Sequence, residues 1–146
     1  MNSVLSLIGL ALRAGRLEAG EDPAGDACRA RRCRLLLTAS DAGESALRRA
    51  ARFAREGECL ILALPFTREE LGRALGRGSC AMAAVTDLGL ARAIAERLEA
   101  QDPDRYGEAV RRLRLKAERA AQRRERSGKK RQDGRSRAPV KDRNKP

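Results

Sequence analysis

The sequence predicts an α/β fold, a three-layer α/β/α sandwich with helices on both faces of a small mixed sheet of about four strands. Short apolar runs alternate along the chain with longer segments in which apolar residues recur at helical spacing. The apolar runs lack polar residues at alternate positions, so both faces of each strand are expected to be buried. A basic helix and a disordered tail are expected to follow this domain.

The first elements are a helix and a short extended segment. Apolar residues at helical spacing predict a helix over residues 3–14, and residues 17–19 are expected to be extended. Asp22 is in position to cap a second helix that runs to about Arg31, with Pro23 at its first position.

A buried strand and a third helix are expected next. The strand corresponds to the apolar run from Arg34 to Thr38. Glu44 follows Asp41 by three residues, which is the spacing of a capping box. The helix that starts there is expected to continue to Gly57, with Leu47 on its buried face.

The second half of the domain repeats this alternation. Strands are predicted at Cys59 to Ala63 and at Cys80 to Val85, where the chain is again continuously apolar. A Thr-x-x-Glu capping box predicts a short helix over residues 67–76 between them. Thr86 and Asp87 are expected to start a further helix with a core-facing stripe of apolar residues.

The charge of the chain is concentrated in its C-terminal part. The chain has 32 basic and 20 acidic residues, and residues 1–102 hold 15 of the basic and 14 of the acidic residues. Residues 103–146 therefore hold 17 basic and 6 acidic residues, a net charge of +11. We expect a domain over residues 1–102, a basic amphipathic helix over 103–126 and a disordered basic tail over 127–146. A polycation points to nucleic acid or an anionic membrane surface, and a tail that only aids solubility is the alternative.

The composition argues against several classes of function. The chain has no histidine, so a Ser-His or Cys-His catalytic pair and a His-ligated metal site are excluded. The four cysteines form no C-x-x-C pair, and phosphate-binding glycine motifs are missing. A thiol nucleophile at Cys28 or Cys80 has no base beside it in the sequence. We therefore expect no enzymatic activity, metal, cofactor, small-molecule substrate or membrane span, and a cytoplasmic protein with reduced thiols.

Recognition of nucleic acid would have to proceed without base stacking, because the chain has only two Phe and one Tyr. Phosphate contacts, helix N-termini and loop backbone would then contribute most of the affinity. Arg29 and Arg32 belong to a small basic group on the folded part, and solvated helix and strand ends are the alternative interpretation of that group.

Three collinear segments carry a family resemblance. Residues 8–22 (IGLALRAGRLEAGED), 35–45 (LLLTASDAGES) and 71–94 (LGRALGRGSCAMAAVTDLGLARAI) resemble the bacterial YlxQ-type branch of the ribosomal protein L-seven-Ae/L-thirty-e superfamily. The resemblance spans about residues 3–98. It implies a compact α/β/α sandwich that binds structured RNA, often kink-turns, without catalysis. Structured RNA, ribosomal RNA or the ribosome is then the expected partner.

The resemblance also suggests where RNA would bind. In kink-turn-binding relatives, the turn after the first strand and the start of the second helix approach sheared G-A pairs, and Gly20 matches that motif. Asp22, Pro23 and Asp26 depart from the relatives' residues. Asp22 and Asp26, together with Glu18 and Glu21, gather negative charge where phosphates would approach, which is unfavourable unless that charge is screened or paired. The candidate RNA-binding residues are Gly20, Glu21, Arg29, Arg32, Ser40, Asp41, Arg77, Gly78, Ser79, Lys129, Lys130, Arg131, Arg135 and Arg137.

Two other functions stay open at this point. One is a protein-interaction module that has lost RNA recognition in its core and binds a partner through its acidic turn. The other is a domain like the substrate-recognition half of an RNA methyltransferase, which has no catalytic activity alone.

Overall fold

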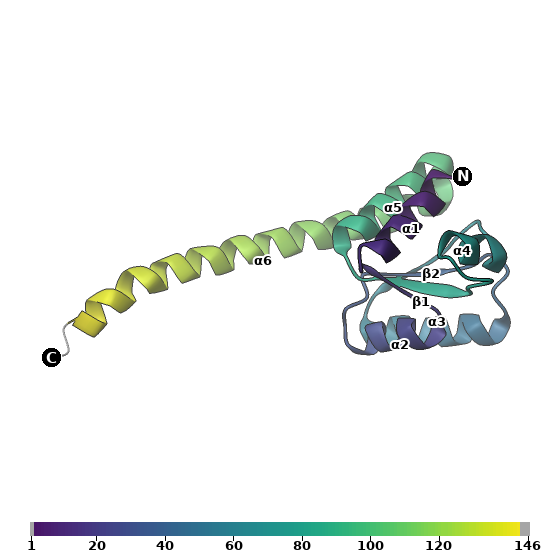
Figure 1. Ribbon diagram of the computed structural model, residues 1–146. Helices are drawn as coiled ribbons and strands as arrows, with labels where there is room; N and C mark the ends of the chain where they lie inside the picture. Colours follow the sequence, from purple (N-terminus) through teal and green to yellow (C-terminus); the bar gives the residue numbers. More distant parts are fainter. Residues whose placement is uncertain (1, 144–146) are drawn as a thin grey trace. The chain divides into compact units, whose positions relative to one another are not determined.

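A computed structural model describes the backbone of residues 2–143 and the side chains of residues 2–128 (Figure 1). The chain divides into two units, Met1–Leu113 and Arg114–Pro146. The elements follow in the order α1 (Ser3–Arg13), β1 (Leu17–Ala19), α2 (Glu21–Arg29), β2 (Leu35–Thr38), α3 (Glu44–Gly57), β3 (Leu60–Ala63), α4 (Arg68–Ala74), β4 (Met82–Val85), α5 (Leu88–Gln101) and α6 (Pro103–Arg143). The predicted alternation of helices and strands is confirmed.

The strands form one mixed sheet of four strands in the order β1-β4-β2-β3. Strand β4 is antiparallel to both of its neighbours, β1 and β2, whereas β2 and β3 are parallel. This topology places the C-terminal ends of β1, β2 and β3 at the same end of the sheet as the start of β4. The loops that follow the first three strands therefore meet the loop that precedes the fourth.

The sheet separates two apolar clusters, which makes the molecule three layers thick. In β2, Leu35 and Leu37 belong to the cluster with α1, α4 and α5, while Leu36 belongs to the cluster with α2 and α3. Strand β4 alternates in the same way, with Ala83 in the first cluster and Met82 in the second. Figure 1 shows α2 and α3 together on one side of the sheet. The predicted sandwich is confirmed.

Strand β3 differs from the expectation that every strand is buried on both faces. It lies at the edge of the sheet, and the side chain of Ile61 is 43% exposed. The apolar sequence of β3 resembles that of the central strands, so its position at the edge could not be read from the pattern. No helix among residues 2–143 has both the length and the apolar character needed to cross a lipid bilayer.

The starts of two helices also differ from the predicted ones. Gly20, not Asp22, is the N-cap of α2, and Gly43, not Asp41, is the N-cap of α3. Leu47, expected on the buried face of α3, is 42% exposed. The capping box of α4 is confirmed, since the Thr67 hydroxyl accepts a hydrogen bond from the Glu70 N–H at 3.1 Å.

The first turns of α6 are part of the folded unit that ends at Leu113. Tyr106, Val110 and Leu113 are buried in the cluster that α1 and α5 cover, and the Tyr106 hydroxyl donates a hydrogen bond to the Ala63 carbonyl at 2.9 Å. The expected domain boundary at residue 102 thus falls before the end of this unit. The side chains of residues 129–146 lie outside the described residues, and the disorder of the tail at 127–146 stays a prediction.

Candidate nucleic-acid interface

Most of the candidate residues on the folded unit meet at one end of the sheet. We call this the loop end and define it by residues 19–22, 39–43, 64–68 and 76–81, which follow β1, β2 and β3 and precede β4. The Gly20 N–H donates to the Met82 carbonyl at 2.9 Å, and the Ala39 N–H donates to the Ala81 carbonyl at 2.9 Å. These hydrogen bonds join segments that are far apart in the sequence.

The turn before α2 lies against the loop before β4. Gly20 has a φ of 99°, a left-handed conformation that favours glycine. The Arg77 guanidinium donates to the Ala19 carbonyl at 3.4 Å, and a Cβ on Gly20 would lie 3.2 Å from its Nη1 atom. Arg77 forms no ion pair among the described residues. Its charge is therefore not neutralised at the start of α2.

Helix α4 supports the loop that contains Gly78 and Ser79. The Arg77 N–H donates to the Gly72 carbonyl at 2.8 Å, and the Cys80 N–H donates to the Arg68 carbonyl at 3.0 Å. The backbone of Ser79 comes so close to α4 that a Cβ on Gly72 would lie 2.6 Å from the Ser79 Cα. The glycine at position 72 is what permits this contact.

Ser40 and Asp41 form the adjacent turn after β2. The Ser40 N–H donates to the Phe66 carbonyl at 2.7 Å. The Asp41 carboxylate accepts a hydrogen bond from the Arg68 N–H at 2.7 Å and lies 3.6 Å from the Arg68 Nε atom. Asp41 thus holds the start of α4, and its carboxylate is engaged within the protein.

Three helices begin at the loop end, and two of them lack a side-chain cap. Gly20 and Gly43 offer no side-chain acceptor to the first-turn N–H groups of α2 and α3, whereas Thr67 caps α4. Helix N-termini carry partial positive charge and free N–H groups, which together favour an anion such as a phosphate. The loop end therefore presents backbone donors as well as the Arg77 guanidinium.

The negative charge expected around α2 is partly paired. Glu21 lies 3.2 Å from the Arg49 guanidinium of α3, and Asp26 lies 2.6 Å from Arg29. Arg49 was not among the predicted residues, because only the packing of α2 on α3 brings it to the start of α2. Glu18 and Asp22 form no ion pair within the part of the chain whose side chains are described.

Arg29 and Arg32 lie at the opposite end of the sheet. Arg29 ends α2, and its guanidinium lies 5.6 Å from the centre of the Phe53 ring. Arg32 belongs to the turn before β2, which starts beside the last residue of β4. The nine residues of α2 span about 14 Å. The predicted residues whose side chains the structure describes thus form two separate groups rather than one patch.

Neither thiol considered as a nucleophile is activated. Burial raises the pKa of Cys80, whose thiol donates a hydrogen bond to the Met82 carbonyl at 3.1 Å. Burial and the neighbouring Cys59 raise the pKa of Cys28 to about 11. Both groups are therefore neutral thiols near pH 7, whereas a nucleophilic cysteine needs a lowered pKa.

Comparison with known proteins gives structural similarity only. No protein-family model matches the chain, and no curated protein matches its sequence. A protein of unknown function from Bacillus halodurans is 28% identical with a TM-score of 0.62, over 68% of this chain and 99% of that one. The Giardia lamblia 15.5kD RNA binding protein is 15% identical with a TM-score of 0.52, over 66% of this chain and 82% of that one. The chain therefore shares its fold with a known RNA-binding protein.

Proposed function

We propose that this chain is a non-enzymatic RNA-binding protein that recognises structured RNA of the kink-turn type at the loop end. The observation that carries the proposal is the convergence of the uncapped starts of α2 and α3 with the Arg77 guanidinium. The fold is shared with an RNA-binding protein, and the resemblance of residues 3–98 to the YlxQ-type branch points the same way. Ribosomal RNA is the proposed source of that structured RNA.

The arrangement suits a folded RNA better than an extended single strand. Single-strand binding sites use aromatic side chains on which bases stack. Phe53 and Phe66 are buried, and so is Tyr106. Backbone N–H groups and a guanidinium contact phosphates without reading base sequence, so recognition would depend on the shape of the RNA backbone.

The basic C-terminal part is proposed to add affinity of low specificity. Residues 103–146 have a net charge of +11, against +1 for residues 1–102. Cations of this kind release counterions from RNA, so their contribution falls steeply with salt concentration. Lys129, Lys130, Arg131, Arg135 and Arg137 are the proposed tail contacts.

The test measures RNA affinity by fluorescence anisotropy with the full chain. A kink-turn RNA is compared with a matched duplex that lacks the G-A pairs, at several salt concentrations. Arg77→Ala is expected to weaken kink-turn binding at least about tenfold, since a hydrogen bond to a charged group contributes roughly 1.5–3 kcal/mol. The negative slope of log affinity against log salt concentration should become shallower by about one, which corresponds to the loss of one phosphate contact.

Arg16→Ala is the matched control. It removes the same charge, its side chain is exposed, and the Thr86 N–H contact to the Arg16 carbonyl places it at the other end of β4. We expect the control to change the affinity less than about twofold. Equal losses in both variants would mean that general electrostatic attraction, not the loop end, binds the RNA. If the chain prefers neither RNA, the protein-interaction module becomes the better hypothesis.

A further inference from the structure

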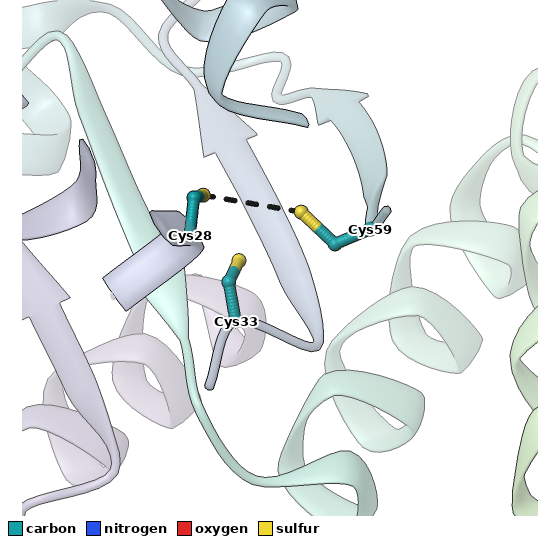
Figure 2. A group of neighbouring side chains, drawn as sticks. All are labelled: Cys28, Cys33 and Cys59. Atoms are coloured by element: carbon teal, nitrogen blue, oxygen red, sulfur yellow. Dashed lines mark hydrogen bonds between the residues drawn. The ribbon is translucent and has the colours of Figure 1, made fainter. Parts of the chain in front are cut away.

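Three cysteine side chains, from the end of α2, the turn before β2 and the residue before β3, converge in the apolar cluster that α2 and α3 cover. The sulfur atoms of Cys28, Cys33 and Cys59 all lie within 4.8 Å of one another, and the Cys28 and Cys59 sulfurs are 3.9 Å apart (Figure 2). Cys28 and Cys33 are buried, Cys59 is partly exposed, and none of the three forms a disulfide bond. The cluster lies at the end of the sheet opposite the loop end.

Local packing brings these cysteines together. Cys28 lies in the last turn of α2, Cys33 in the turn before β2 and Cys59 directly before β3. A Cβ on Gly57 would lie 2.7 Å from the Cys28 carbonyl oxygen, so the glycine lets the end of α3 reach α2. An ion pair of 3.2 Å between Arg31 and Glu58 joins the two turns on which Cys33 and Cys59 lie.

The distances between the sulfurs are close to those of a metal-thiolate site. Sulfur atoms bound to tetrahedral zinc at about 2.3 Å lie about 3.8 Å from one another. The 3.9 Å between Cys28 and Cys59 already matches this value, and the 4.8 Å limit leaves at most about 1 Å of adjustment. A sulfur atom moves that far by a small rotation about the bonds of its side chain.

We propose that Cys28, Cys33 and Cys59 bind one Zn²⁺ ion as thiolates, with a water molecule as the fourth ligand. Three S–H bonds break and their protons pass to solvent, while the electron pair of each sulfur forms a Zn–S bond. No atom changes oxidation state. The partly exposed Cys59 side is where the water reaches the metal.

Charge favours Zn²⁺ over a monovalent soft ion. Three thiolates and Zn²⁺ carry a net charge of −1, whereas three thiolates and Cu⁺ carry −2, and buried net charge is costly. The ion would tie α2, the turn before β2 and the turn before β3 together, which makes its role structural.

The test uses the full chain, reduced with a phosphine and freed of metal. Co²⁺ is the spectroscopic probe and Zn²⁺ the competitor. We expect one equivalent of Co²⁺ to give sulfur-to-metal charge-transfer absorption and tetrahedral visible bands, both abolished by one equivalent of Zn²⁺. Cys59→Ser and Cys33→Ser should each weaken Zn²⁺ binding more than about tenfold. Zn²⁺ should raise the Tm of the wild-type chain but not of these variants.

Cys80→Ser is the matched control, because Cys80 is a buried thiol in the other apolar cluster and its hydrogen bond to Met82 suits a hydroxyl as well. It should bind Zn²⁺ as the wild type does. Less than half an equivalent of bound metal, a Co²⁺ spectrum without sulfur charge transfer, or wild-type affinity in Cys59→Ser would overturn the proposal. If Cys33→Ser fails to fold, the Zn²⁺ affinity of Cys59→Ser and the Co²⁺ spectrum of the wild type still test the proposal, since Cys59 is the more exposed ligand.

Discussion

The contact between Gly72 and Ser79 makes a prediction about both stability and RNA binding. In Gly72→Ala, the new Cβ would lie 2.6 Å from the Ser79 Cα and 2.8 Å from its nitrogen. Ordinary contacts begin at 3.4 Å, so the Ser79 backbone must retreat by about 0.8 Å. The hydrogen bonds of Arg77 and Cys80 to α4 oppose that movement, because they hold both sides of the loop.

Two opposing effects set the size of the change in the free energy of unfolding. Overpacking typically costs about 1–3 kcal/mol, and we take the upper part of that range, about 2–3 kcal/mol, because the clashing atoms belong to the Ser79 backbone and cannot rotate away. Replacing glycine by alanine inside a helix recovers about 1 kcal/mol. We therefore expect Gly72→Ala to lower the free energy of unfolding by about 1–2 kcal/mol and the Tm by roughly 4–10 °C. Kink-turn affinity should fall as well, because Arg77 moves with the loop.

Gly78→Ala is the control for this prediction. It lies in the same loop, but a Cβ there would have nothing within 4 Å. Its Tm should match that of the wild type. Thermal unfolding followed by circular dichroism measures the Tm of both variants, and the anisotropy assay measures the kink-turn affinity of Gly72→Ala. A Gly72→Ala protein as stable as Gly78→Ala would refute the reasoning that the close approach fixes the loop.

Two further predictions concern the first turns of α6. Leu113→Ala should lower the free energy of unfolding, measured by urea titration, by about 2–5 kcal/mol because Leu113 is fully buried. Leu115→Ala, at a position that is 46% exposed, should change it by less than about 0.5 kcal/mol, and equal effects would contradict the assignment of Leu113 to the core. Burial raises the pKa of Tyr106, the single tyrosine of the chain, so its ultraviolet absorbance should titrate at a higher pH in the folded chain than in urea. Because folding favours the neutral hydroxyl, the contribution of Tyr106 to the free energy of unfolding is complete below the ordinary tyrosine pKa of about 10 and is lost as the pH rises through the pKa of the folded chain. A folded chain whose tyrosine titrates at the ordinary pKa would contradict this prediction.

The order of elements could be predicted because it depends on local pattern. Apolar spacing marks the helices, and the Thr67 capping box identifies the start of α4 from two residues alone. Helix starts at glycine were missed, since Asp22 and Asp41 are the better caps by residue type. Asp41 instead accepts a hydrogen bond from the Arg68 N–H, a partner that only the tertiary structure brings close.

The candidate site could be predicted only in part, because local pattern does not report which segments the tertiary structure brings together. Gly20 and the loop of Arg77, both among the candidate residues, come together because the order of the strands brings them to one end of the sheet. Arg29 and Arg32 are close in sequence to Gly20, but the length of α2 carries them to the other end. The pairing of Glu21 with Arg49 and the convergence of the thiols depend on contacts between distant segments, which spacing along the chain does not report.

The hydrogen bond from Tyr106 to Ala63 also bears on self-association. The Leu64 N–H donates to the Thr38 carbonyl, so residue 64 faces β2 and Ala63, one residue earlier, faces the open side of β3. Tyr106 and Arg105 both donate to that outward carbonyl, at 2.9 and 3.4 Å. An open strand edge is a template for pairing with another chain. The start of α6 thus occupies an acceptor that a strand from a second molecule would need, and a chain shortened before Tyr106 would be prone to aggregate through β3.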